Sequence, residues 1–305
     1  MTDADLGPDP QYKPPVLPRE EAAALAARHG LRRVGTRPAL GRYLRDLWSC
    51  RHLAWTMSKG EVISAHRDNY LGLLWSVITP ILVGIAYYLI FGILFDLRRD
   101  VENFISFLTI GLFTFTFVSS VLTAGSKALI GKVGMMRALA FPRVILPVVV
   151  VVSSFVSNIP AFLVLVLIAL ISGEPVTASW LLFPFALLIV AVMGLGLAMI
   201  MARVVHAVRD VANLIPVAVR LLRYASGVFF SIEARVAAIA SAPAWVGPAM
   251  ELQPVAVSLT LVRETLMDEM PLQGMTWAVA SGWAVLFLTV GFFVFWRAEG
   301  TYGRA

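Results

Sequence analysis

The chain is poor in cysteine and in charge. Of its 305 residues, one is a cysteine, Cys50, and 14% are charged. A single cysteine excludes an internal disulfide and a cysteine-ligated metal cluster. Soluble proteins carry about 25% charged residues, so the low charge content argues against a soluble fold.

The sequence also lacks the groups that nucleotide chemistry and acid–base catalysis need. A phosphate-binding loop follows the pattern Gly-x-x-x-x-Gly-Lys-Ser/Thr, but here Gly131 and Lys132 are followed by Val133. The four histidines are scattered, and the acids Glu264, Asp268 and Glu269 have no histidine beside them and no metal-like spacing. We therefore expect no catalytic residue, metal site or cofactor on this chain, and any ATP and Mg²⁺ would be bound by another protein.

What the chain has in excess is apolar residues, 59% of the total. They form runs long enough to cross the hydrocarbon core, which takes about 20 helical residues. We predict an all-α integral membrane protein with six spans, at about 71–95, 104–126, 144–171, 180–202, 211–231 and 275–296. Pro80 predicts a kink in the first span, and Gly194 and Gly196 predict a close helix approach in the fourth.

The first 70 residues differ from the rest. Residues 1–38 are polar and proline-rich, so we predict a disordered cytoplasmic extension with a short helix at 20–30. Over 39–70, leucines and aromatics recur on one helix face and basic residues occupy the other, which predicts a gate helix lying on the membrane surface. The alternative is a cytosolic helix packed on a small soluble domain. The candidate gate residues are Arg42, Arg45, Trp48 and Arg51.

A short basic segment, 127–143, separates the second and third spans. It contains lysines and arginines, no acid, and apolar side chains between them. Such a loop stays in the cytoplasm, and its apolar residues suit contact with a separate motor subunit. We call 127–143 the coupling segment, within the six-span domain 71–305. Its candidate contact residues are Lys127, Ile130, Lys132, Met135, Met136, Arg137, Phe141, Pro142 and Arg143.

Charge distribution predicts the orientation. Lysine and arginine exceed the acids in 1–70, 127–143, 203–210 and 297–304, and acids exceed them in 96–102 and 233–269. The positive-inside rule therefore places both termini in the cytoplasm of a multi-pass protein of the plasma membrane. The outer segment 232–273 holds apolar stretches too short to span, broken by prolines, which predicts a re-entrant pair of helices. A small extracytoplasmic cap is the alternative.

Charged residues are absent from the middles of the predicted spans except in the fifth, where Arg220 and Arg223 share a helix face. An arginine at membrane depth is costly unless it faces water, an acid or a phosphate, so we expect both to face a conduit. Alternatively, the span starts later and both lie near its cytoplasmic end. Aromatic rings stack on sugar faces, although ordinary packing also explains them. The conduit candidates are Tyr87, Tyr88, Arg220, Arg223, Tyr224 and Phe229.

Four motifs in this order resemble the permease subunit of polysaccharide-exporting ABC transporters, the ABC-2 type that exports O-antigen, teichoic acid or galactan. The resemblance covers roughly residues 40–300, and the composition resembles actinobacterial galactan exporters most. Where this chain has Gln253, the family commonly has Asn. The motifs are Arg67-Asp68 with Leu71-Gly72, Trp75 and Pro80; Phe141-Pro142-Arg143 with Leu146-Pro147; Arg209-Asp210-Val211; and Leu252-Gln253-Pro254 with Arg263.

The resemblance implies an ATP-driven exporter of an undecaprenyl-pyrophosphate-linked polysaccharide, with two ATP-binding subunits docked on the coupling segment and the gate helix. One six-span subunit has little surface to enclose a wide path, so we expect a homodimer. The composition predicts no nucleic-acid partner, because the basic residues lie beside the spans. Two alternatives stay open: an ABC-2 type drug or lipid exporter, and a non-transport membrane protein such as a multispan enzyme or scaffold.

Overall fold

The structure is a computed structural model that describes residues 18–29, 39–67, 74–95, 101–138, 141–237 and 243–302. Every regular element in these ranges is a helix. The chain divides into two compact units, Met1–Thr36 and Arg37–Ala305. The first unit contains α1 (Arg19–Arg28), close to the predicted helix at 20–30. The prediction of disorder before residue 18 lies outside the described residues.

Within the described ranges, five helical segments are long and apolar enough to cross a membrane, which confirms an all-α integral membrane fold. Their bounds follow the predicted runs closely. The segments are Val77–Leu94, formed by α4 (Trp75–Tyr87) and a π-helix (Tyr88–Leu94); α5 (Phe104–Ser126); α7 (Ile145–Ile171); Ala178–Ala207, formed by a short 3₁₀ turn and α8 (Phe183–Ala207); and α13 (Gly274–Arg297).

The predicted fifth span is shorter than expected. Helix α9 runs over Val211–Ala225, 15 residues, below the about 20 that a straight crossing takes. It ends because Gly227 adopts a φ of 67°, a left-handed conformation that stops a helix and that glycine adopts without strain. The chain then turns through 226–230 instead of continuing along the axis of α9. The predicted total of six membrane crossings therefore stays a prediction.

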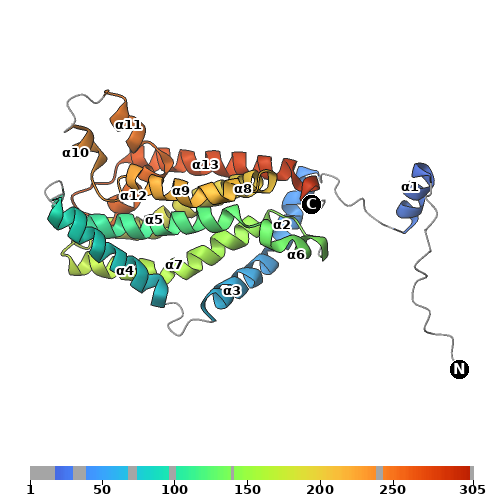
Figure 1. The fold of residues 1–305 in the computed structure, drawn as a ribbon, viewed down its shortest axis with the longest axis horizontal. Helices are drawn as coiled ribbons and strands as arrows, with labels where there is room; N and C mark the ends of the chain where they lie inside the picture. The colour runs from blue at the N-terminus through green and yellow to red at the C-terminus, as the bar shows by residue number, and fades with distance from the viewer. Residues whose placement is uncertain are drawn as a thin grey trace. The chain divides into compact units, whose positions relative to one another are not determined.

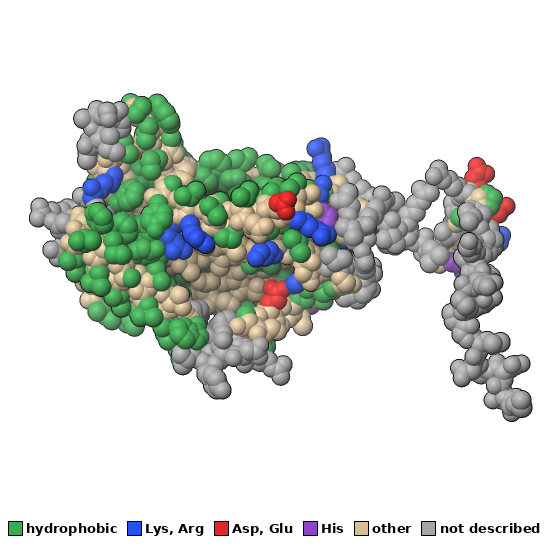
Figure 2. Space-filling model, in the orientation of Figure 1, with side chains coloured by type: hydrophobic (Ala, Val, Ile, Leu, Met, Phe, Trp, Pro, Cys, Tyr) green, Lys and Arg blue, Asp and Glu red, His purple; other side chains and the backbone are tan. Residues whose placement is uncertain are grey.

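Helix α5 lies at the centre of the bundle. It packs against α7, α8, α9 and α12. The side chains along α5 are mostly buried, whereas far smaller shares are buried in the spans formed by α4, α7 and α13. Figure 1 shows α5, α7, α8 and α13 running side by side, with α10 to α12 at one end and α2 and α6 at the other. Figure 2 shows hydrophobic side chains over much of one face, as lipid contact requires.

Small residues bring α8 and α13 together. A Cβ placed on Gly196 would lie 2.2 Å from the carbonyl carbon of Phe287, and one on Gly291 would lie 2.5 Å from the carbonyl oxygen of Gly196. Gly194 similarly faces Val121 of α5, at 3.1 Å. The predicted close approach at Gly194 and Gly196 is therefore confirmed, and it depends on the missing side chains.

The described part of the outer segment contains three short helices, α10 (Ile232–Ala237), α11 (Val246–Glu251) and α12 (Pro254–Leu266). From Val255 to Leu266, every side chain of α12 except Thr260 is buried. Helix α12 packs against α5, α8 and α13. A cap on the outer surface would leave one helix face in solvent, so this burial favours a helix inserted among the spans.

The opposite end carries α2 (Leu40–Ser49) and α3 (Arg51–Arg67), joined at Cys50. The predicted amphipathic helix is thus divided in two, and α3 packs along α7. The coupling segment forms a 3₁₀ turn (Ile130–Lys132) and α6 (Val133–Ala138). Both elements belong to the same compact unit as the spans.

Candidate functional site

The coupling segment divides into exposed and buried parts. Lys127 and Ile130 are exposed, Ile130 by 41%, while Met136 is 3% exposed and packs with Tyr43 and Phe295. Met136 therefore holds the segment on its own bundle, and its predicted contact with a partner stays a prediction. The others are half-buried or buried: Lys132, Met135, Phe141, Pro142 and Arg143. The side chain of Arg137 lies outside the described residues.

A buried carboxylate joins the coupling segment to the gate helix. Glu299, just after α13 in a 3₁₀ turn (Glu299–Thr301), accepts a 2.8 Å hydrogen bond from the Tyr43 hydroxyl. Its other oxygen accepts one from the backbone N–H of Arg143 at 3.0 Å and lies 3.5 Å from Arg143 Nη1. The Arg143 guanidinium also donates to the Glu299 carbonyl oxygen, at 3.1 Å. Burial raises the pKa of Glu299, and the bonds from Arg143 and Tyr43 partly offset that rise.

A second ion pair ties the coupling segment to α3. Lys132 pairs with Glu61, and the other Glu61 oxygen accepts a 3.1 Å hydrogen bond from the Ser153 hydroxyl of α7. Lys132 and Glu61 are 26% and 30% exposed. The coupling segment, α3 and α7 therefore meet at Glu61.

The gate candidates point away from the bundle. Arg42, Arg45, Trp48 and Arg51 are all exposed, Trp48 by 72%, and the Arg51 guanidinium lies 5.3 Å from the Trp48 ring centre. On the opposite face of α2, Tyr43 is 1% exposed. The helix thus packs on its own chain through one face and presents an exposed aromatic and cations on the other. That outer face is typical of a membrane interface.

Four of the six conduit candidates lie together. The Phe229 ring lies 4.4 Å from Tyr87 and 5.5 Å from Tyr224, and it stacks on Phe91 at 4.7 Å. Arg223 Nη1 lies 3.5 Å from the Tyr87 hydroxyl, and its guanidinium lies over the ring of Phe115, 5.2 Å from its centre. We call Tyr87, Phe91, Arg223, Tyr224 and Phe229 the aromatic cluster.

Within the described ranges, Arg223 forms no ion pair, and its Nε atom is buried without a hydrogen-bond partner. An arginine left this way has donors to offer to an anion. Arg220, one helical turn earlier, is exposed and lies outside the aromatic cluster. Tyr88 points elsewhere, against Phe104 and into an apolar cavity between α4 and α5. The structure therefore separates the two arginines that shared a helix face in the prediction.

The outer end of the bundle is held by Arg263 of α12. Its guanidinium, 3% exposed, donates to the carbonyl oxygens of Phe107, Gly227 and Val228 at 3.0–3.3 Å and lies 3.4 Å from the Phe107 ring centre. Because these carbonyls belong to α5 and to the turn after α9, one side chain joins three elements. It also fills the space beside Gly111, where a Cβ would lie 2.5 Å from Arg263 Nη2.

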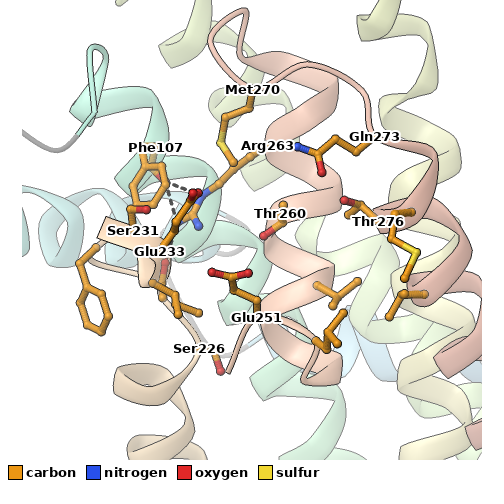
Figure 3. A pocket seen from close by; sticks show the side chains of 17 residues that line it. Phe107, Ser226, Ser231, Glu233, Glu251, Thr260, Arg263, Met270, Gln273 and Thr276 are labelled. Carbon is orange, nitrogen blue, oxygen red and sulfur yellow. Dashed lines mark hydrogen bonds between the residues drawn. The ribbon is translucent and has the colours of Figure 1, made fainter. Parts of the chain in front are cut away.

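Beside Arg263 lies what we call the outer cavity, two adjoining hollows of about 290 and 270 Å³. They share the lining residues Phe107, Ser231, Glu233, Thr260, Met270 and Gln273. Figure 3 shows Glu251 and Thr260 projecting into the first hollow, with Gln273 and Thr276 on its other side. Burial, and then the charge of Glu233, raises the pKa of Glu251 above its ordinary value.

Sequence reasoning missed the residues that link these parts. Glu299 and Glu61 were not singled out, although Glu299 is the lone acid in the short basic segment after the last span, a signal that was present. Arg263 was named only within a motif. The sequence separation of 256 residues between Tyr43 and Glu299 leaves no local pattern to find.

In the described part of the chain, the structure is an all-helical multi-pass membrane protein. The coupling segment, α2 and the segment after α13 are linked at one end, and a polar cavity lies at the other. The sequence profile described as ABC-2 type transporter matches residues 52–267. The chain belongs to the ABC-2 type transporter family.

Among curated proteins, it is similar to an O-antigen export system permease protein RfbA of Myxococcus xanthus, with 28% identity over 194 residues, 63% of this chain and 73% of that one. Two proteins of the same name from Klebsiella pneumoniae are 25% and 24% identical over 170 residues. That alignment covers 54% of this chain and 64% of each relative.

Proposed function

We propose that the chain is the membrane subunit of an ATP-driven exporter that carries a lipid-linked polysaccharide, of the O-antigen or galactan kind, across the plasma membrane. The family and the O-antigen export permeases it resembles support this function. The observation that carries it is the aromatic cluster, in which Phe229 packs on Tyr87 and Phe91, and Tyr87 contacts Arg223, which has no acidic partner among the described residues. Aromatic rings contact sugar faces without distinguishing one sugar from another, and a guanidinium without an acidic partner attracts a pyrophosphate.

The energy would come from a separate ATP-binding subunit, two copies for a homodimer of this chain. Its docking surface is the exposed part of the coupling segment, Lys127 and Ile130, with the outer face of α2 beside it. Contact there acts through Arg143 and Glu299 on the gate helix, and through Lys132 and Glu61 on α3 and α7. Both termini then lie in the cytoplasm, as the positive-inside rule requires.

The exposed face of α9 suits the dimer contact that a shared path needs. Leu214, Val217, Leu221 and Tyr224 are each at least half exposed and recur at helical spacing on one face. In a homodimer, the same face of a second copy would cover them. Tyr224 belongs to this face and to the aromatic cluster, so the path would run beside the contact.

Export in cells tests the glycan function. The gene would be deleted, and variants would be compared for polysaccharide at the cell surface at equal membrane expression. We expect Arg223→Gln to reduce export at least about tenfold, equivalent to 1.4 kcal/mol, and Arg297→Gln, an exposed control at the end of α13, to leave it unchanged. Arg220→Gln tests whether the exposed arginine contributes. Unchanged export in Arg223→Gln would refute the pyrophosphate contact.

Co-purification tests the motor. A tagged chain expressed with the ATP-binding protein encoded beside it should retain that protein, and Ile130→Asp should release it while Ile63→Asp, an exposed position on α3, should not. A chain that never retains an ATPase, or that transports without one, would end the transporter proposal.

The second candidate is an ABC-2 type drug or lipid exporter. One observation favours it: the apolar cavity of about 220 Å³ between α4 and α5, lined by Pro80, Gly84, Tyr88 and Leu108 among others. An acyl chain fits such a lining. Deletion that changes lipid or drug efflux while surface polysaccharide stays normal would select this candidate.

A further inference from the structure

The outer cavity is rich in hydrogen-bond acceptors. Glu233 and Glu251 line its first hollow, and Glu264 and Glu269 line the second. Arg263 is the only lysine or arginine among its described lining residues, and its guanidinium is committed to three backbone carbonyls and the Phe107 ring. The cavity therefore repels anions, and its carboxylate oxygens can accept hydrogen bonds from a ligand.

One of those acceptors is buried, and one of its two oxygens lacks a close hydrogen-bond partner. Glu264 is 2% exposed, and its Oε2 accepts a 3.1 Å hydrogen bond from the backbone N–H of Gln273. Its Oε1 is buried without a hydrogen-bond partner in the described part of the chain. A buried acceptor left unpaired costs about 1–3 kcal/mol, so a hydroxyl that reached Oε1 would recover that loss.

A metal ion does not account for these acids. Within the described ranges, no set of three histidine, cysteine, aspartate or glutamate side chains is placed to hold one. The remaining lining instead combines hydroxyl groups with apolar surfaces, Ser231 and Thr260 with Phe230 and Met270. Acceptors, hydroxyls and an aromatic ring together match the hydroxyl groups and C–H faces of a sugar.

The cavity also lies next to the aromatic cluster. The turn at 226–231 separates the two: Phe229 packs on Tyr87 and Phe91, while Ser226, Phe230 and Ser231 line the cavity. A chain leaving the aromatic cluster toward the outer side meets the cavity next. Its first hollow, about 290 Å³, is just below the range of about 300–1,000 Å³ for ligand sites, and the second hollow adjoins it.

We propose that the outer cavity is a binding site for uncharged sugar units, with Glu251, Thr260 and Glu264 accepting or exchanging hydrogen bonds with their hydroxyls. This inference rests on the proposed function, because it gives the exported polysaccharide a resting point on the outer side. A sugar held there resists sliding back while the cytoplasmic end resets. It also gives the carrier a preference for neutral over acidic glycans.

Saturation-transfer NMR on the full chain in lipid nanodiscs tests the site. The probes are lactose and maltose as uncharged sugars, digalacturonate as the acidic match, and CaCl₂ as the metal. We expect saturation transfer to lactose and maltose with a Kd near 1 mM, equivalent to about −4.1 kcal/mol, little transfer to digalacturonate, and no competition from calcium.

Variants localise the binding. Glu251→Gln and Thr260→Val change partly exposed groups, and each should weaken the Kd at least about fivefold. Glu264→Gln, which puts an amide donor where the unpaired Oε1 lies, should do the same. Glu102→Gln is the matched control, since Glu102 is an exposed acid on the same side that does not line the cavity. If Glu264→Gln does not fold, the other two variants still decide.

Four results would overturn the proposal. The first three are no transfer to either neutral sugar, equal transfer in all variants, and stronger transfer to digalacturonate. The fourth is calcium that displaces the sugars, because it would make the acids a metal site. The measurement needs no ATPase and no export. A sugar that binds in a chain that fails the export and co-purification tests therefore separates this inference from the proposed function.

Discussion

The hydroxyl of Tyr43 donates a 2.8 Å hydrogen bond to Glu299, across 256 positions of the sequence. Tyr43 belongs to the gate helix and Glu299 follows the last span, while Arg143 at the end of the coupling segment donates to the same carboxylate. One buried carboxylate thus receives donors from two elements that a motor subunit would contact. The gate helix and the coupling segment are therefore expected to move together.

Tyr43→Phe should weaken this link. The change removes one donor from a buried carboxylate, and we expect a loss of about 1–3 kcal/mol in the free energy of unfolding. Thermal unfolding of the detergent-purified chain measures it. Tyr224→Phe is the control, because the described residues show no hydrogen bond to that hydroxyl. Equal melting temperatures for Tyr43→Phe and wild type would contradict the assignment.

The same carboxylate predicts a pH dependence. Burial raises the pKa of Glu299 in the folded chain, so the folded state binds the proton more tightly than the unfolded state does. The stabilising contribution is complete below the unfolded pKa, about 4.3 for a glutamate, and is lost as pH rises through the raised folded pKa. Glu299→Gln should flatten this part of the stability curve. A variant that keeps the wild-type slope would show that another group titrates.

A charge exchange tests the pair between Lys132 and Glu61. Because both are partly exposed, each single reversal, Lys132→Glu or Glu61→Lys, should cost about 1 kcal/mol or less in stability but lower export clearly, since it detaches the coupling segment from α3. The double variant should restore most of the export. Failure of the double variant to exceed the singles would mean that Lys132 acts on a partner and not on Glu61.

Arg263 should tolerate no substitution. Arg263→Lys keeps the charge, but an ammonium cannot reproduce the planar fork that reaches carbonyls of α5 and of the turn after α9. We expect a loss of about 3–5 kcal/mol, as for other buried charges left without partners, seen as aggregation in size-exclusion chromatography. Arg209→Lys, at an exposed position, should elute as wild type does.

Substituting Gly196 should disturb the packing of α8 against α13. An alanine there would place its Cβ 2.2 Å from the backbone of Phe287, so α8 and α13 would have to separate. Gly282→Ala in α13 is a matched control, because nothing lies within 4 Å of the Cβ it would add. We expect the melting temperature to fall for Gly196→Ala and to hold or rise for the control, where alanine favours the helix by about 1 kcal/mol.

The apolar runs predicted the bounds of most helices, because the residues at the ends of a run also cap or end the helix. The span predicted at 104–126 is α5 to the residue, since Asn103 caps it through a hydrogen bond from the Ser106 N–H and basic Lys127 follows it. The fifth run was extended too far. It reads as apolar to residue 231, but the backbone of Gly227 turns it after Ala225.

The candidate sites were predictable only in part, because the sequence pattern identifies residues by type and spacing and not by their distant contacts. Tyr224 and Phe229 lie close in sequence and were named with Tyr87 as conduit candidates, but the contact of Phe229 with Tyr87 was not predicted. The acceptors of Glu299 and Glu61 and the donors of Arg263 depend on contacts between distant segments. Hydropathy and charge counts carry no information on such pairs, so these residues appeared only in three dimensions.

Helix α5 has a mechanical consequence. Its first turns carry Phe107, which holds Arg263 and lines the outer cavity, and its last residue, Ser126, leads directly into the coupling segment. Unlike α4, α7 and α9, it has no proline inside it, so its 23 residues form a stiff rod of about 35 Å. Under the proposed function, a tilt of α5 at the end next to the coupling segment would also move its other end, beside Arg263. Binding in the outer cavity would then change whenever the ATP-binding subunit moves the coupling segment.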